Sequence, residues 1–345
     1  MRQWLLLTVL EFSQHPLIPT LLPKEKGFRT LSLGRAQGEG PHPTKMKASA
    51  MTMNLCLPTV YLNGSFMPIE EAKISPLDRG FIFGDGVYEV IPFYAGRGLR
   101  MREHLKRLQR SLDELEIENP YPIEHWETTI TSLIETNGGG NVGVYIQVTR
   151  GVAKRDFPPP KGLTQTVFMM VNPLATPKPE IYAKGISCVS LDDNRWLKCQ
   201  IKSVALLGAV LLKHESKQAG ADEAVLFRDG YLTESSASNI AAVKNGVILC
   251  PPMDNLILPG ITYELMIELA TKNKMPLEIR RVARKEVKKA DELWIMSSTK
   301  EVAPIVMLDD KPIGTGQPGP IFKQMYHHFQ DYKRTLSAVS ATAEK

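Results

Sequence analysis

Cysteine is scarce in this chain, and the few cysteines are isolated. The 345 residues include Cys56, Cys188, Cys199 and Cys250, without a C-x-x-C pair or a regular spacing. A chain of this length can bury a sizeable core without disulfide staples, so this pattern fits a reducing compartment and predicts a cytoplasmic protein. The seven histidines show no H-E-x-x-H spacing, and we expect no metal site.

Long apolar runs and a strong charge are also missing. No run approaches the roughly eighteen apolar residues that span a bilayer, and the short run WLLLTVL is followed directly by Glu11. The formal net charge is +5, and residues 1–50 supply +4 of it. Because the remainder is close to neutral, it has no basic face of the kind that binds nucleic acid. We therefore expect no membrane and no nucleic-acid partner.

Residues 1–57 read as an extension outside the fold and without a fixed structure. Their Arg and Ser content with few acids is compatible with a transit peptide. Met46, Met51 and Met53 precede the first strand-like segment, so a start codon placed too far upstream explains the extension equally well. A basic extension that binds nucleic acid is a further hypothesis, which salt-sensitive affinity would test.

From about residue 58 the patterns predict an α/β (α+β) fold with much antiparallel sheet. Asn63-Gly64, Gly96 with Gly98, and Asp229-Gly230 mark three hairpins. Apolar spacing predicts helices over 102–117, 125–140 and 261–273, another that opens with Lys202, and strands over 141–152, 185–191 and 239–249. Prolines near 173–182 predict a boundary between a small α/β domain at 58–175 and a larger domain at 183–335, followed by a tail at 336–345.

Lys202 is the first candidate catalytic residue, because a charged residue directly precedes an apolar helical face. The first turn of a helix and apolar neighbours both disfavour an ammonium group. A neutral amine can attack a carbonyl and form a Schiff base. A solvated or snorkelling lysine is the simpler alternative.

A Schiff-base lysine often serves pyridoxal phosphate, which also needs a phosphate cradle, a partner for its ring nitrogen and a clamp for the substrate carboxylate. Helix N-termini and hydroxyl-rich loops can hold a phosphate, arginine can add a forked contact, and a carboxylate can keep the ring nitrogen protonated. An ordinary helix start and surface side chains are the simpler alternatives. The candidates are Gly260, Ile261 and Thr262, the loop Ser297-Ser298-Thr299, Arg107, and Glu234.

Seven segments carry a family resemblance. They are DRGFIFGDGVYEV, EHLKRL, VTRGVAKR, RWLKCQIKSVALLGAVLLK, LTESSASNI, LILPGIT and SSTKEVAPI. Their order and spacing over residues 58–335 resemble the class IV (fold type IV) pyridoxal-phosphate aminotransferases, most closely the D-amino-acid transaminases. The resemblance implies a two-domain fold, a homodimer with active sites near the subunit interface, and amino acid and 2-oxo acid substrates.

The resemblance also implies roles for individual residues. Lys202 matches the Schiff-base lysine, and Glu234 the partner of the ring nitrogen. Leu258 matches the leucine packed behind the ring. The phosphate-binding positions match Arg107, Gly260, Ile261, Thr262 and Ser298.

For the substrate carboxylate, Tyr88 matches the family tyrosine and Arg155 the arginine lent by the neighbouring subunit. The family histidine, two residues further on, is replaced by Phe157. This change removes a hydrogen-bond donor and alters the expected substrate range and D-selectivity.

The resulting prediction is ping-pong transamination between an amino acid, of D configuration such as D-alanine, and 2-oxoglutarate or pyruvate. Rivals with the same cofactor are a branched-chain L-amino-acid aminotransferase, an aminodeoxychorismate lyase and an R-selective amine transaminase. A catalytically silent binding protein is the alternative from another class.

Overall fold

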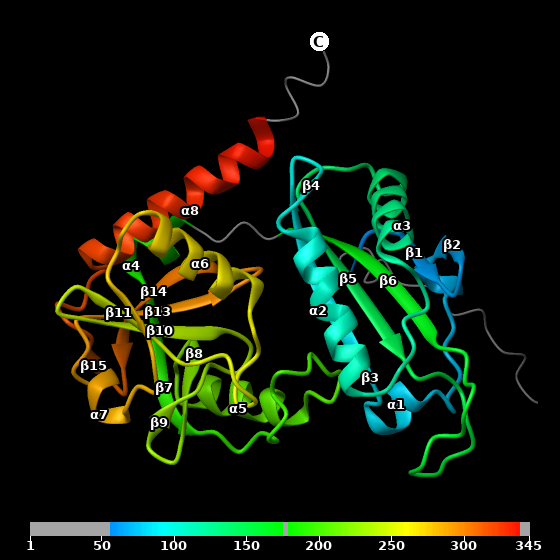
Figure 1. Cartoon of the computed structure of the whole chain (residues 1–345), viewed down its shortest axis with the longest axis horizontal. Helices are drawn as coiled ribbons and strands as arrows, with labels where there is room; N and C mark the ends of the chain where they lie inside the picture. Colours follow the sequence, from blue (N-terminus) through cyan, green and yellow to red (C-terminus); the bar gives the residue numbers. More distant parts are fainter. Residues whose placement is uncertain (1–55, 175–178, 339–345) are drawn as a thin grey trace, which may run out of the picture. The chain divides into compact units, whose positions relative to one another are not determined.

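The computed structural model describes residues 56–174 and 179–338 (Figure 1). The predicted extension up to residue 55 and the end of the chain from residue 339 lie outside the described residues. The helices are α1 (Arg79–Phe83), α2 (Met101–Glu114), α3 (Ile123–Thr136), α4 (Pro179–Lys184), α5 (Leu207–Gln218), α6 (Ile261–Lys272), α7 (Arg284–Val287) and α8 (Pro320–Ala338), with a 3-10 helix at Ile69–Glu71.

The strands form two separate sheets in the described chain. The first has the order β2-β1-β6-β5-β3-β4, and the second β12-β11-β10-β13-β14-β7-β8-β9 with β15 on β14. The first contains β1 (Thr59–Leu62), β2 (Ser65–Pro68), β3 (Gly86–Tyr94), β4 (Arg97–Gly98), β5 (Val142–Thr149) and β6 (Thr166–Pro173). The second contains β7 (Ile186–Asp192), β8 (Glu223–Arg228), β9 (Tyr231–Leu232), β10 (Asn239–Lys244), β11 (Val247–Cys250), β12 (Leu277–Ile279), β13 (Glu292–Ser297), β14 (Glu301–Leu308) and β15 (Lys311–Pro312).

The first sheet is antiparallel throughout and packs one face against α2 and α3. In α2 the apolar spacing seen in the sequence buries Leu105, Leu108 and Leu112, which meet alternate residues of β3 such as Val87 and Ile91. The opening hairpin turns as predicted, because Asn63 and Gly64 adopt φ angles of 48° and 96°.

The second sheet is mixed and is covered on both faces. β7 pairs in parallel with β8 and β14, while β10, β13 and β14 pair antiparallel. Helices α6 and α8 pack on one face, and a second apolar cluster that includes Val287 of α7 covers the other (Figure 1). Leu99, from the segment between β4 and α2, is buried in the α6 and α8 cluster, which ties the two sheets together.

The predicted helix at Lys202 is wrong in its starting point. Helix α5 begins at Leu207, and Lys202 lies in the preceding loop. Long-range backbone hydrogen bonds hold this loop, since Val204 donates to the carbonyl of Gly86 at 3.0 Å. Lys202 therefore does not stand in the first turn of a helix, and the predicted effect of a helix N-terminus on its amine is wrong.

No helix within residues 56–174 and 179–338 has the length and apolar character needed to cross a bilayer. The same residues contain no group of three or more His, Cys, Asp or Glu side chains arranged to hold a metal ion. The cysteines carry free thiols, and Cys188, Cys199 and Cys250 are buried.

Candidate functional site

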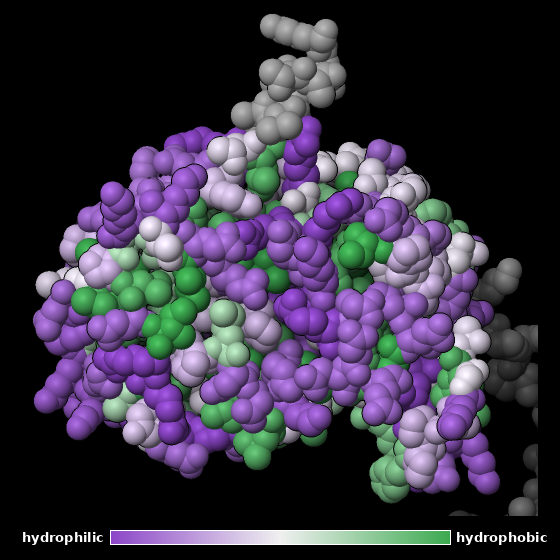
Figure 2. Space-filling model, in the orientation of Figure 1, coloured by the Kyte–Doolittle hydropathy of each residue, from purple (hydrophilic) through white to green (hydrophobic). Residues whose placement is uncertain are grey.

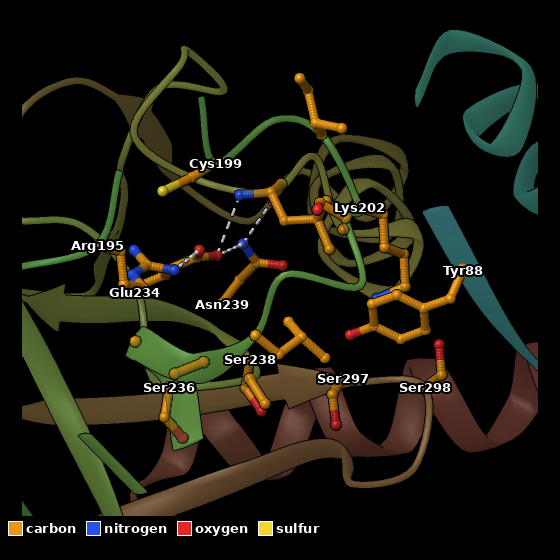
Figure 3. Close-up of a pocket in the computed structure, with 18 of the residues that line it drawn as sticks. Tyr88, Arg195, Cys199, Lys202, Glu234, Ser236, Ser238, Asn239, Ser297 and Ser298 are labelled. Carbon is orange, nitrogen blue, oxygen red and sulfur yellow. Dashed lines mark hydrogen bonds and ion pairs between the residues drawn. The ribbon is translucent and has the colours of Figure 1, made fainter. Parts of the chain in front are cut away.

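A pocket of about 400 Å³ brings together most of the predicted site. Figure 3 shows Lys202 and Tyr88 at one side of this pocket, and Arg195, Glu234 and Asn239 at the other. The predicted residues that line it are Tyr88, Arg107, Lys202, Glu234, Leu258, Gly260, Ile261, Thr262 and Ser298.

Lys202 is held at the edge of the pocket through its backbone. Its N–H donates to the hydroxyl of Ser111 on α2 at 3.2 Å, and its carbonyl accepts from the N–H of Tyr88 on β3 at 2.9 Å. The amine Nζ lies 4.1 Å from the centre of the Tyr88 ring. The side chain is only half-buried, so the amine is accessible to a molecule in the pocket.

The N-terminus of α6 presents free hydrogen-bond donors to the pocket. Gly260 caps this helix without a side-chain bond, and the first N–H groups of a helix have no intrahelical acceptor. Ile261 and Thr262 follow, with the Thr262 side chain buried. Because donors and the positive end of the helix dipole converge here, the geometry suits an anion.

Arg107 is buried beside this helix end and is already bound by a carboxylate. Its Nε and Nη2 donate to Glu89 at 2.7 and 2.9 Å, and its Nη1 donates to the carbonyl of Pro259 at 2.9 Å. His104 contacts the same carboxylate at 2.8 Å. Burial opposes the ionisation of Glu89, but Arg107 and His104 outweigh it and lower the pKa of Glu89. A further contact of Nη2 with Nδ1 of His104 at 3.4 Å fixes Arg107 in place, and the second N–H of Nη1 stays free for an anion in the described structure.

Glu234 lies opposite Lys202 in a network of donors. Its Oε2 accepts from the amide of Asn239 and from the N–H of Leu258, both at 3.1 Å, and its Oε1 accepts from Arg195. Burial raises the pKa of Glu234, while Arg195 and the Leu258 N–H act in the opposite direction. The pocket thus combines an amine, an anion cradle and a buried carboxyl group.

Comparison with known proteins identifies the family. A model of the amino-transferase class IV family matches residues 86–308. The chain belongs to the class IV aminotransferases. The D-alanine aminotransferase of Bacillus licheniformis is 38% identical over 285 residues, which cover 83% of this chain and 99% of that protein.

Two solved structures share the fold of this class IV aminotransferase. The branched-chain amino acid aminotransferase of Escherichia coli aligns with a TM-score of 0.75 at 24% identity, over 78% of this chain and 92% of that one. The T.th. branched-chain amino acid aminotransferase, complexed with N-(5'-phosphopyridoxyl)-L-glutamate, aligns with a TM-score of 0.74 at 27% identity, over 80% and 93%. These matches confirm the predicted α/β fold and family, whose members depend on pyridoxal phosphate.

Arg155 does not line the pocket of its own chain. It is exposed, and its guanidinium carbon lies 5.8 Å from the centre of the Phe83 ring. The loop that carries it is anchored by buried Arg79, which donates to the carbonyls of Asp156 and Phe157 at 2.7 and 2.9 Å. In this class IV aminotransferase, the loop exposes Arg155 to solvent. Its role in substrate binding stays a prediction.

Several polar residues of the site were missed by the sequence analysis. Arg195 and Asn239 both stand inside segments that carry the family resemblance, and Glu89 interrupts an apolar strand. A charged residue within an apolar strand requires a partner when it is buried, so Glu89 was detectable as a candidate. Arg195 and Asn239 had no such local signal.

The hydroxyl-rich turn after β13 also reaches the pocket. Ser297 and Ser298 both line it, and the Ser297 hydroxyl accepts from the N–H of Lys300 at 3.1 Å. Within the residues that the structure describes, the Ser298 hydroxyl has no such bond, so it is the freer of the two to bind a ligand. The choice of Ser298 over its neighbour stays a prediction.

Proposed function

We propose that this class IV aminotransferase binds pyridoxal 5'-phosphate and transfers an amino group between a D-amino acid, such as D-alanine, and 2-oxoglutarate or pyruvate. The observation that carries the proposal is one pocket that unites an accessible amine, an anion cradle and a buried carboxyl group. Each matches one requirement of the cofactor, namely a covalent anchor, a phosphate site and a partner for the ring nitrogen.

The residues present fit this cofactor. At position 260 a Cβ would lie 2.0 Å from Oδ1 of Asn239, so glycine lets the start of α6 lie directly against Asn239, and the free N–H groups of this helix start suit a phosphate. Arg107, Gly260, Ile261, Thr262 and Ser298 are proposed to hold the phosphate. Leu258 is proposed to pack against the ring, and Glu234 to face the ring nitrogen.

Lys202 is the proposed catalytic residue. Its Nζ anchors the cofactor, which when bound supplies an electron sink for the substrate's α-carbon. A free Nζ of Lys202 would take the proton from the substrate's α-carbon and hold it for return. Because the amino group would remain with the cofactor after the first product leaves, the two half-reactions would follow one another in a ping-pong cycle. Tyr88, whose ring centre lies 4.1 Å from Nζ, is proposed to orient the substrate carboxylate.

The choice of a D-amino acid rests on relatives and on the carboxylate clamp. The Bacillus licheniformis relative is a D-alanine aminotransferase. Arg155, with Tyr88, would supply the clamp, and its own chain keeps it out of the pocket, which agrees with a role at a neighbouring subunit. A branched-chain L-amino-acid aminotransferase is the second candidate, favoured by the 27% identical T.th. enzyme and by the apolar Phe157. An aminodeoxychorismate lyase of the same family is the third.

We also propose that the protein is a homodimer and that it is located in the cytoplasm. The outer face of α5, next to the pocket, exposes Leu207, Val210 and Leu211 to 71%, 57% and 55%. Figure 2 shows hydrophobic atoms gathered where α5 lies in Figure 1. Contiguous exposed apolar surface of this kind supports a subunit interface, and the free thiols support a reducing location. The separate sheets support a small domain at 58–175 and a larger one at 183–335.

Borohydride trapping tests the anchor. The holoprotein is reduced, digested and mapped by mass spectrometry, with Lys202→Ala and a second lysine variant, Lys198→Ala, treated in parallel. We expect the label on Lys202 in the parent protein and in Lys198→Ala. A label on another side chain, or none, overturns the proposal.

A substrate screen tests the specificity. D- and L-alanine, glutamate and leucine are assayed as donors with 2-oxoglutarate and pyruvate, and aminodeoxychorismate is assayed for lyase activity. We expect D-alanine to be turned over faster than any L-amino acid. Faster turnover of L-leucine than of every D substrate would replace this proposal by the branched-chain alternative.

A further inference from the structure

Arg195 bridges two buried carboxyl groups at the wall of the pocket. Its Nε and Nη2 donate to the two oxygens of Asp193 at 2.9 and 2.8 Å, and its Nη1 contacts Oε1 of Glu234. The side chains of Arg195, Asp193 and Glu234 are exposed by only 11%, 0% and 6%. Figure 3 shows Arg195 reaching Glu234 from the side away from Lys202.

The contacts of Glu234 leave one acceptor position open. A carboxylate offers about four lone-pair positions. Asn239 and Leu258 fill two on Oε2, and Arg195 fills one on Oε1. Oε1 can therefore accept one more hydrogen bond, and its direction is set by the arginine that occupies the other position. A protonated ring nitrogen is the kind of donor that this position suits.

Arg195 is also the cation that balances this carboxylate. Asp193, Cys199 and Tyr263 are further titratable groups that interact electrostatically with Glu234. Burial raises the pKa of the Cys199 thiol to about 11 and raises that of Tyr263 as well, so both stay neutral. Asn239 and Leu258 donate neutral hydrogen bonds only. Without Arg195, burial would favour the neutral acid, which cannot stabilise a protonated ring.

We propose that Arg195 is a positioning residue that keeps Glu234 ionised and aims Oε1 at the ring nitrogen of the cofactor. This inference rests on the proposed use of pyridoxal phosphate. Arginine is required because its planar fork binds Asp193 with two N–H groups while a third reaches Glu234. A lysine keeps the charge but cannot make this set of contacts at once.

The experiment compares two ligands on the apoprotein. One is pyridoxamine 5'-phosphate, and the other is its 1-deaza analogue, which has C–H in place of the ring nitrogen. Affinities are measured by fluorescence titration from pH 5 to 9 for the parent protein, Arg195→Gln and Arg195→Lys. Arg228→Lys is the matched control, because Arg228 also binds Asp193, at 3.2 Å, and has no contact with Glu234 in the described structure. Circular dichroism checks that each variant is folded.

In the parent protein, we expect pyridoxamine 5'-phosphate to bind more tightly than the 1-deaza analogue. In Arg195→Gln this preference should fall by roughly ten- to a hundredfold, the range for losing one hydrogen bond to a charged group. The pH below which pyridoxamine 5'-phosphate binding weakens should rise, because Glu234 becomes easier to protonate. Arg195→Lys should recover part of the preference, and Arg228→Lys should retain it.

The outcomes separate the two proposals. A parent protein that binds neither ligand refutes the proposed cofactor site. A parent protein that binds both ligands equally tightly refutes the role of Glu234 at the ring nitrogen, and with it that of Arg195, but not the cofactor site. A parent preference that persists unchanged in folded Arg195→Gln refutes the role of Arg195 alone. If Arg195→Gln does not fold, Arg195→Lys decides, since an undiminished preference there shows that the fork is not needed.

Discussion

Gly260→Ala provides a direct test of how the pocket is held together. The added Cβ would lie 2.0 Å from Oδ1 of Asn239 and 3.3 Å from Cβ of Tyr263. The backbone of Gly260 has φ −75°, which alanine tolerates, so the conflict is steric and not conformational. The side chain of Asn239 must turn away to relieve it.

The expected loss of cofactor affinity follows from the hydrogen bonds that the Asn239 side chain makes. Its amide donates to Glu234 at 3.1 Å and to the carbonyl of Leu258 at 2.8 Å. Each hydrogen bond contributes about 1 kcal/mol net. Losing both makes the free energy of cofactor binding less favourable by about 2 kcal/mol. At 1.4 kcal/mol per tenfold change, this corresponds to about 30-fold weaker binding.

Titration of the apoprotein with pyridoxamine 5'-phosphate measures the effect. Gly143→Ala is the matched control, because a Cβ there meets only Leu174 at an ordinary 3.8 Å. Asn239→Ala completes a double-mutant cycle, in which the two substitutions together should cost no more than either alone. Unchanged affinity in Gly260→Ala, or simple additivity in the cycle, would refute the reasoning.

Three further predictions concern stability, specificity and assembly. Burial opposes the ionisation of Glu223, but Lys300 and Lys213 lower its pKa from 4.5 to about 2. The ionised carboxylate therefore contributes about 3 kcal/mol to the free energy of unfolding above pH 4.5. This contribution is lost as the pH falls toward 2. In urea unfolding, the free energy of unfolding of Glu223→Gln should fall less between pH 4.5 and 2 than that of the parent protein. An equal fall in both proteins would contradict the assignment. Phe157→His should raise kcat/KM for D-alanine about tenfold through one added bond to a charged group, while Phe157→Leu should not; equal effects would exclude a donor role. Leu211→Glu should lower the mass measured by light scattering to that of a monomer and Lys217→Glu should not, so a dimer that survives Leu211→Glu argues against the α5 interface.

Much of the fold was predictable because its signals are local. The two-residue turn at Asn63-Gly64 requires positive φ angles that these residue types tolerate, so it identified its hairpin without any knowledge of the rest of the chain. The leucines of α2 recur at helical spacing because one face of that helix covers the first sheet. The residues of the pocket were found through the order and spacing of short motifs, and the structure brings nine of them to one place.

The sequence alone determined the family, the turns, most helices and strands, and which side chains to examine, since these depend on residue type and on neighbours a few positions away. Tertiary structure decided where Lys202 stands, because its loop is held by Ser111 and Tyr88, which are 91 and 114 positions away. It also decided that Arg195 meets Glu234, 39 positions further along the chain. Such contacts depend on how strands and loops distant in sequence come together, and no local spacing encodes them.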